Sequence, residues 1–367
     1  MSELEAQLDE VDNTTGAVAT DDAVKQPAFE LTSSRQFTSW LVESGWSRAF
    51  TTYQAGKILL LGTKSDGSLS IFNRNLNRCM GIAVKDSSLF VGTLTEIVRF
   101  ENAMSKNDHA TQGEDALFVP QMCWYTGDMD IHDLAIGDDG LIFVNTLFSC
   151  LGQPSVTHSF KRLWQPSFID RLAAEDRCHL NGVAMRNGAP AYVTAVAETN
   201  IADGWRDHRR DGGIVIDVQT GEIAARGLSM PHSPRWYRDR LWVLNSGEGT
   251  LGYIDTDQGA FVPLAFCPGY LRGLTFHENY AIVGLSEPRG SRTFADLPLQ
   301  ARLDKEAITA RCGLYVIDLE TGDIVHWARI SGVVKELYDV AFMGGVRNPA
   351  MIGFHTGEIR RIISIDQ

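Results

Sequence analysis

Three histidines, His132, His179 and His232, stand at or just before the start of similar hairpin-like stretches. Imidazole nitrogens commonly bind Zn, Fe or Cu, and three such ligands leave coordination positions open for water or substrate. Each histidine could instead hydrogen-bond to neighbouring backbone in a purely structural role. Their recurrence in register makes the two interpretations about equal. We adopt the metal site, with a divalent transition metal held by all three residues, as the prediction to test.

Three further residues could complete a reactive site. Arg272 has a planar guanidinium suited to a carboxylate or phosphate, although it could equally pair with an acid such as Glu248 or Glu287. Tyr338 could donate a proton, but a buried aromatic plug is the simpler interpretation. Glu248 follows the hairpin of His232 and could also move protons. We predict Arg272, Glu248 and Tyr338 as catalytic residues, with Arg272 anchoring an anionic substrate.

Four residues are candidates for substrate binding. Asn181 occupies the same place in its hairpin as the histidines occupy in theirs, and Met80 would form an apolar wall. Trp205 and Arg206 belong to the charged stretch 204–211, which we predict to be a lid over the site. A solvated surface loop is the alternative for that stretch.

These residues must be positioned by a repeated hairpin. The stretch 129–146, MDIHDLAIGDDGLIFVNT, reads as a short strand, a tight turn and a second apolar strand. Similar hairpins recur at 48–63, 80–93, 132–146, 181–195, 232–246, 272–286 and 338–354. A second type of hairpin follows several of them, at 212–223, 251–261 and 313–324.

Two hairpins per unit make a four-stranded blade, and the units start on average about 48 residues apart, a period typical of propellers. We therefore predict an all-β fold, a single β-propeller over residues 28–367. Seven blades match the seven copies. Six is the alternative, because only 30 residues separate Phe50 from Met80. We expect an N-terminal strand, near 29–31, to complete the last blade and close the ring.

In a propeller the first strand of each blade lines the central channel, so the residues that enter these strands share one mouth. The predicted entering residues are Phe50, Met80, His132, Asn181, His232, Arg272 and Tyr338. The loops that leave the second strands reach the same face and carry Glu198, Asn200, Glu248, Glu287 and His355. Loops on one face of a rigid scaffold are the usual place for binding.

Composition narrows the class of protein. The formal net charge is −13, too acidic for a general nucleic-acid or anionic-membrane surface, and many of the acids lie in residues 1–27, which we predict to be a disordered tail. No signal peptide and no long apolar span is recognisable, so we predict a cytoplasmic protein. Because no P-loop, GxGxxG, GxSxG or HExxH motif occurs, we expect no nucleotide cofactor.

The chain resembles a bacterial family of conserved hypothetical proteins. The resemblance rests on DIHDLA, HLNGVA, MPHSPRW, WRDHRRDGG and HWARISGVVKELYDV, and it extends over residues 30–360. The Asn-Gly-Val-Ala at 181–184 is distantly similar to blade starts in gluconolactonase and strictosidine-synthase propellers. In the gluconolactonase group, acid and amide oxygens hold a divalent metal. This chain has histidines at the matching places, which favours a transition metal over calcium.

Together these features predict a metal-dependent enzyme that acts on a small anionic substrate or peptide by hydrolysis or elimination. Metal-dependent oxidation, as in an oxygenase, is the second possibility. A propeller that binds a peptide or protein partner without catalysis is the third.

Overall fold

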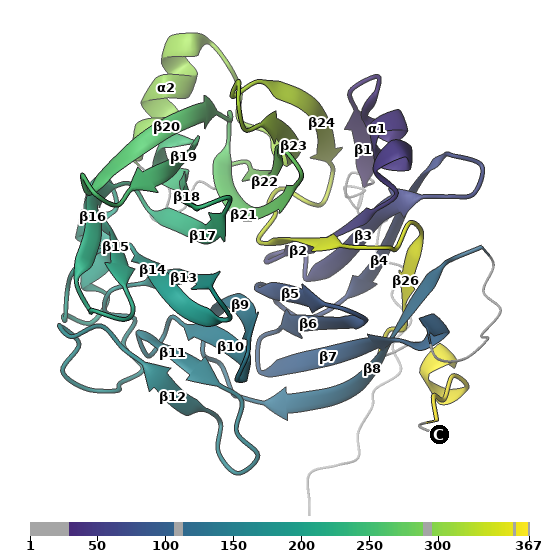
Figure 1. The fold of residues 1–367 in the computed structure, drawn as a ribbon, viewed down its shortest axis with the longest axis horizontal. Coiled ribbons are helices and arrows are strands. Elements are labelled where there is room, and N and C mark those ends of the chain that lie inside the picture. The colour runs from purple at the N-terminus through teal and green to yellow at the C-terminus, as the bar shows by residue number, and fades with distance from the viewer. Residues whose placement is uncertain (1–28, 106–112, 289–295, 355–356, 366–367) are drawn as a thin grey trace, which may run out of the picture.

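The computed structural model describes residues 29–105, 113–288, 296–354 and 357–365. The predicted acidic tail, 1–27, and His355 lie outside these residues. Six sheets stand around a central channel like the blades of a propeller (Figure 1). The prediction of an all-β propeller is therefore confirmed, and the blade count is six.

Three blades follow the simplest order, in which four consecutive strands run from the channel outward. They are formed by β9 (Ile131–Gly137), β10 (Gly140–Asn145), β11 (Cys150–Gln153) and β12 (Lys161–Trp164); by β13 (Leu180–Arg186), β14 (Ala189–Ala195), β15 (Gly213–Asp217) and β16 (Ile223–Leu228); and by β17 (Pro231–Tyr237), β18 (Arg240–Asn245), β19 (Thr250–Asp255) and β20 (Ala260–Phe266).

Two blades carry a fifth strand at the outer edge. One consists of β5 (Ile82–Lys85), β6 (Ser88–Gly92), β7 (Glu96–Asn102) and β8 (Ala116–Tyr125), with β26 (Pro349–Met351) added in parallel. The other consists of β21 (Tyr270–His277), β22 (Tyr280–Ser286), β23 (Cys312–Asp318) and β24 (Ile324–Ser331), with β1 (Glu30–Ser33) added antiparallel.

The sixth blade closes the ring and explains why seven blades was wrong. Its inner strand is β25 (Val340–Met343), and its outer strands are β2 (Ser47–Thr52), β3 (Lys57–Thr63) and β4 (Leu69–Asn75). Phe50 pairs with Val340, so the hairpin copies at Phe50 and Tyr338 belong to one blade and were counted twice. The N-terminal strand predicted to close the ring lies elsewhere, because β1 pairs with β24. Closure joins the C-terminal β25 to β2.

Apolar side chains fill the spaces between blades. Val144, Leu180 and Val193, from three different strands of two adjacent blades, belong to one buried cluster. Helix α1 (Phe37–Ser44) buries Phe37 and Leu41, and α2 (Pro298–Glu306) buries Leu299 and Leu303. Short 3-10 helices occur at η1 (Ala103–Ser105), η2 (Gly204–His208), η3 (Ser246–Glu248) and η4 (Gly357–Arg360). None of the helices in the described residues is long and apolar enough to cross a lipid bilayer.

The six inner strands pack side by side around the channel. One residue after each entering position, a glycine alternates with a polar residue around the ring: Gly81, Asp133, Gly182, Ser233, Gly273 and Asp339. Each polar side chain accepts a hydrogen bond from the next blade's backbone: Asp133 from the Val183 amide, Ser233 from Gly273 and Asp339 from Ile82, all at 3.0 Å. A Cβ atom on Gly182 would lie 2.4 Å from Pro234 Cδ, so the glycine makes room for this contact.

Arg235 completes this level of the channel. Its two terminal nitrogens donate to the two oxygens of Asp133 at 2.8 and 3.0 Å, and one of them lies 3.6 Å from Asp339. Although burial lowers it, the pKa of Arg235 is raised above its ordinary value by these two carboxylates. We call Asp133, Ser233, Arg235 and Asp339 the polar layer.

Candidate functional site

The entering residues of the inner strands gather at one end of the channel. His132 lies edge to face with His179, with ring centroids 4.8 Å apart, and 5.5 Å from the ring of Tyr338. The Arg272 guanidinium lies over the Tyr338 ring, 4.5 Å from its centroid. We call the buried set His132, His179, Asn181, His232, Arg272 and Tyr338 the polar mouth.

A repeated backbone turn holds two of the histidines. Asp130, two residues before His132, and Met230, two residues before His232, have φ values of 53° and 46°, in the left-handed region that non-glycine residues rarely adopt. In both cases the histidine Nδ1 donates to the carbonyl oxygen of that residue, at 2.8 Å. A carbonyl oxygen can only accept, so Nδ1 carries the proton and Nε2 is left as an acceptor.

His179 is held differently. It lies two residues before Asn181, at the left-handed position of the turn, with φ of 50°. Its Nδ1 donates to Asp176 Oδ2 at 2.8 Å, and its ring stacks on Trp205 with centroids 4.0 Å apart. Trp205 Nε1 donates to the same carboxylate oxygen at 2.8 Å. Asp176 therefore orients both rings. His179 stands two residues earlier in its blade than His132 and His232 stand in theirs.

Burial and neighbouring charge set the protonation states of the mouth. Burial lowers the pKa of His132 to about 4, against the opposing charge of Asp130. Burial and the Arg272 cation lower the pKa of His232 well below its ordinary value. Burial raises the pKa of Tyr338 well above its ordinary value. The Arg272 cation lowers this pKa, but by less. At neutral pH these two imidazoles and the phenol are uncharged, and Arg272 supplies the positive charge.

Four buried polar atoms in the mouth have no hydrogen-bond partner among the described residues: Asn181 Oδ1, His232 Nε2, Arg272 Nε and the Tyr338 hydroxyl. They come from the entering residues of four consecutive blades. Buried polar atoms in proteins are nearly always paired, so these four are candidates to bind a ligand or an ordered water.

The alternative partners considered for Arg272 are engaged elsewhere. Glu287 pairs with Lys335 at 3.2 Å. Glu248 lies in η3, where burial raises its pKa and Arg302 of α2 is the opposing charge. Among the described ion pairs, Arg272 has no carboxylate partner, so its guanidinium is available to an anion. Within the part of the chain that the structure describes, no contact joins Glu248 to the histidines. We therefore assign no proton transfer to Glu248.

The histidines do not form a recognisable metal centre. Within the part of the chain that the structure describes, no three His, Cys, Asp or Glu side chains are grouped so that they could hold a metal ion. The three-histidine metal site stays a prediction.

The four residues predicted to bind substrate lie in different surroundings. Asn181 lies in the mouth, where its Nδ2 donates to the Pro231 carbonyl at 2.9 Å. Met80 is buried just before β5, the inner strand that packs between β25 and β9. Trp205 is only 2% exposed and packs against His179, so it is a fixed wall and not part of an open lid. Arg206 is exposed and pairs with Asp203 at 2.9 Å, outside the mouth.

Two aspartates that orient the site were not recognised in the sequence. Asp130 forms an ion pair with Arg78, and Asp176 holds His179. Burial raises the pKa of Asp130, but the charges of His132, His179 and Arg78 outweigh it and lower the pKa overall. The signal was present as an aspartate two residues before His132 and three before His179.

A family model described as a domain of unknown function, DUF4915, matches residues 35–352. No curated protein matches the chain. Among solved structures, a chain of a nidogen/laminin complex is 12% identical, with a TM-score of 0.50, and the match covers 82% of this chain and 99% of that one.

Two other solved structures are similar at lower TM-scores. An inactive virginiamycin B lyase from Staphylococcus aureus, solved with quinupristin, is 11% identical, with a TM-score of 0.39 and coverage of 83% and 99%. The computationally designed protein Ika8 is 12% identical, with a TM-score of 0.34 and coverage of 79% and 76%. At 12% identity, the match to the nidogen/laminin chain speaks to the fold alone.

Proposed function

Because the chain belongs to the DUF4915 family, which its description leaves without a function, we propose a function from the polar mouth itself. We infer that the mouth binds a small anionic molecule and catalyses proton transfer on it, in an elimination or a hydrolysis.

The four unpaired atoms define what such a molecule must offer. Arg272 Nε and the Tyr338 hydroxyl are donors, whereas His232 Nε2 and Asn181 Oδ1 are acceptors, because their other polar atoms already bond to backbone. A carboxylate or phosphate oxygen would satisfy the two donors. A neighbouring hydroxyl or amine on the same molecule would satisfy the two acceptors. A hydroxy acid, an amino acid or a phosphorylated analogue has this combination.

The same atoms could move protons. His232 is uncharged, and its Nε2 would accept a proton from the ligand, while the Tyr338 hydroxyl would donate one to a leaving oxygen. The Arg272 cation is one cause of the low pKa of His232. A bound anion would offset that charge and make the imidazole a stronger base. The unpaired donors and acceptors on four consecutive blades carry this proposal.

Anion binding can be measured by isothermal titration calorimetry with L-malate, L-serine, phosphoserine and inorganic phosphate as probes. We expect at least one to bind, and to bind more than about tenfold more weakly to Arg272→Met, since a charge-assisted pair is lost. Arg226→Met is the matched control, because Arg226 is exposed and pairs with Glu198. The proposal fails if no probe binds, or if Arg272→Met binds as the wild type does.

The predicted metal can be tested separately. Protein purified without a histidine tag would be incubated with Zn, Fe or Cu and analysed for bound metal. Stoichiometric metal that is lost in folded His132→Ala and His232→Ala variants would support the three-histidine centre. Retention of the metal in both variants, or no bound metal, would leave the mouth as a site that works through its side chains alone.

A further inference from the structure

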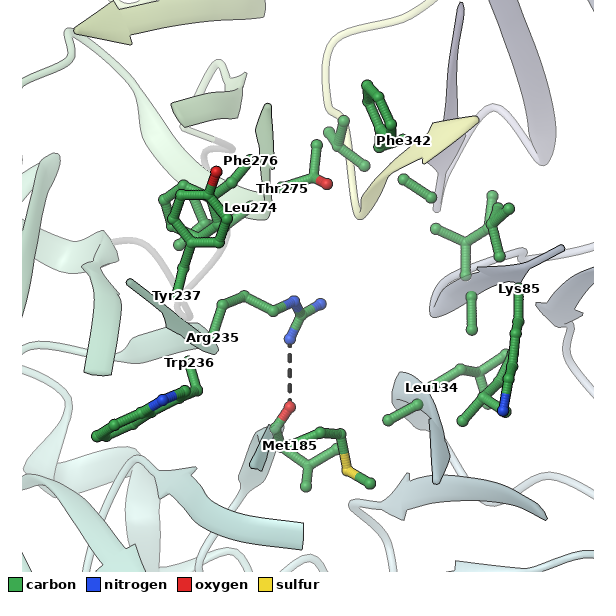
Figure 2. A pocket seen from close by; sticks show the side chains of 18 residues that line it. Lys85, Leu134, Met185, Arg235, Trp236, Tyr237, Leu274, Thr275, Phe276 and Phe342 are labelled. Carbon is green, nitrogen blue, oxygen red and sulfur yellow. Dashed lines mark hydrogen bonds between the residues drawn. The ribbon is translucent and has the colours of Figure 1, made fainter. Parts of the chain in front are cut away.

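A hollow lies at the other end of the channel from the polar mouth. It has a volume of ≈ 470 Å³ and is lined by residues from all six inner strands (Figure 2). On β17, the order is His232 in the mouth, Ser233 and Arg235 in the polar layer, then Trp236 and Tyr237 in the hollow. On the other inner strands too, the entering residue precedes the residues that line the hollow, so the level of the polar layer lies between the mouth and the hollow.

Most of the residues that line the hollow are apolar or aromatic, although Lys85, Arg235 and Thr275 are polar. Met185, Trp236, Leu274, Phe276 and Phe342 line it, and Figure 2 shows them around a central space. Tyr237 stacks on Phe276 with ring centroids 4.5 Å apart and planes 4° from parallel, while its hydroxyl donates to the Glu278 carbonyl at 2.7 Å. The Tyr237 ring therefore presents a flat apolar face, with its polar end already paired.

The charges around the hollow disfavour an ionic occupant. Arg235 reaches into it (Figure 2), but its charge is opposed by both Asp133 and Asp339, which leaves no net positive charge at the floor of the hollow. No acidic side chain is among the residues that line the hollow, so a cation would also lack a partner there. Lys85 lies exposed at the rim.

Arg235 keeps one side-chain donor that none of its own hydrogen bonds uses. The hydrogen bonds of Arg235 in the structure come from Nη1 and Nη2, and its Nε takes part in none of them. A hydrogen-bond donor at the floor of a hollow lined mainly by apolar and aromatic residues would orient a molecule that carries an acceptor, with the Thr275 hydroxyl on the lining and Lys85 at the rim as further donors.

We propose that this hollow is a second binding site, for an uncharged and largely aromatic molecule with one hydrogen-bond acceptor directed at Arg235. It is independent of the anion site proposed for the mouth.

The probe for this site is 6-propionyl-2-(dimethylamino)naphthalene, a neutral ketone whose fluorescence shifts to the blue in apolar surroundings. We expect saturable binding with one equivalent per chain. The matching naphthylamine without the ketone should bind about tenfold more weakly, since it leaves the donor unpaired. Met185→Trp and Thr275→Trp, which fill the hollow, should each weaken binding at least tenfold. Val156→Trp, which adds the same side chain at a position 96% exposed, should have no effect.

Three outcomes would overturn the proposal: no binding of the ketone, binding that survives both filling substitutions, or tighter binding of the anionic probe anilinonaphthalene sulfonate. If the filled variants do not fold, as judged by circular dichroism, the comparison of ketone and naphthylamine on the wild type still decides. Arg272→Met should keep the ketone site, so loss of anion binding at the mouth would not be mistaken for loss of this one.

Discussion

At the scale of single residues, the three histidines differ in what holds Nδ1. A backbone carbonyl accepts from His132 and from His232, whereas the Asp176 carboxylate accepts from His179. A carboxylate partner stabilises a protonated imidazole much more than a carbonyl does. The three residues are therefore suited to different roles, despite their similar places in the sequence.

The low pKa of His132 predicts that mild acid weakens the fold. An unfolded histidine binds a proton near pH 6.5, but folded His132 resists protonation down to about pH 4. The unfolded chain therefore holds more protons between these values, and stability present above pH 6.5 is lost as the pH falls towards 4. This contribution should fall by about 1.5 kcal/mol between pH 7.5 and 5.5, and His132→Gln should remove it.

Urea unfolding at the two pH values measures the effect as the difference between wild type and His132→Gln. The difference is needed because the pKa of Asp339, raised to about 7 by burial and by Asp133, contributes in the opposite direction over the same range. An equal pH dependence in the two proteins would contradict a buried neutral His132.

The Asp176 carboxylate should be important for stability as well as for the site. Its replacement in Asp176→Ala leaves the Nδ1–H of His179 and the Nε1–H of Trp205, both largely buried, without an acceptor. We expect a loss of about 2–4 kcal/mol in the free energy of unfolding. Asp203→Ala, which removes an exposed carboxylate paired with Arg206, is the control and should cost much less. Similar losses in both variants would argue against the orienting role of Asp176.

At the scale of elements, the inner strands meet through the alternation of glycine with Asp or Ser one residue below the mouth. This alternation lets each polar side chain reach the backbone of the next blade, so neighbouring strands are aligned by side-chain-to-backbone bonds and not by a sheet ladder. The position of each entering residue follows from this alignment.

Gly182→Ala tests the close approach of the strands. The added methyl group would lie 2.4 Å from Pro234 Cδ and 3.1 Å from Asp133 Oδ2, so β13 and β17 must separate. We expect a loss of about 1–3 kcal/mol in thermal or urea unfolding, with weaker anion binding at the mouth. Gly357→Ala, where nothing lies within 4 Å of the added atom, should be close to neutral. A neutral Gly182→Ala would show that the strands are not tightly fitted there.

At the scale of the whole molecule, β25 is the strand that completes the ring. It pairs with β2 and packs against both β21 and β5, so it contacts elements from the two ends of the blade series. Tyr338 and Asp339 immediately precede it, and the last member of the mouth and of the polar layer therefore depends on closure.

Removal of β25 should open the ring. A chain that ends at Gly332 loses the inner strand of the sixth blade and leaves Phe50 and Leu59 exposed, residues that are now buried. We expect the cooperative thermal transition to disappear or to fall sharply in temperature. A chain that ends at Gly353 keeps β25 and β26 and should unfold cooperatively. Equal unfolding of the two truncated chains would contradict closure by β25.

Much of this architecture is visible in the sequence because each hairpin is a local structure. Alternating apolar residues and tight turns depend on near neighbours in the chain, so the propeller and most entering residues could be predicted. The blade count could not, because Phe50 belongs to an inner or a second strand depending on a partner, Val340, that lies at the far end of the chain.

The sequence by itself determined the repeated hairpins, the gathering of His132, Asn181, His232 and Arg272 at one mouth, and an acidic chain with 44% hydrophobic residues to fill a large core. Only the tertiary structure decided which charges are paired. Glu287 bonds to Lys335, and among the residues that the structure describes no carboxylate forms an ion pair with Arg272. The hollow behind Arg235 also arises only from the tertiary structure, because it forms where six strands from distant parts of the chain meet. Pairing and enclosed space depend on distances between segments, which local patterns do not encode.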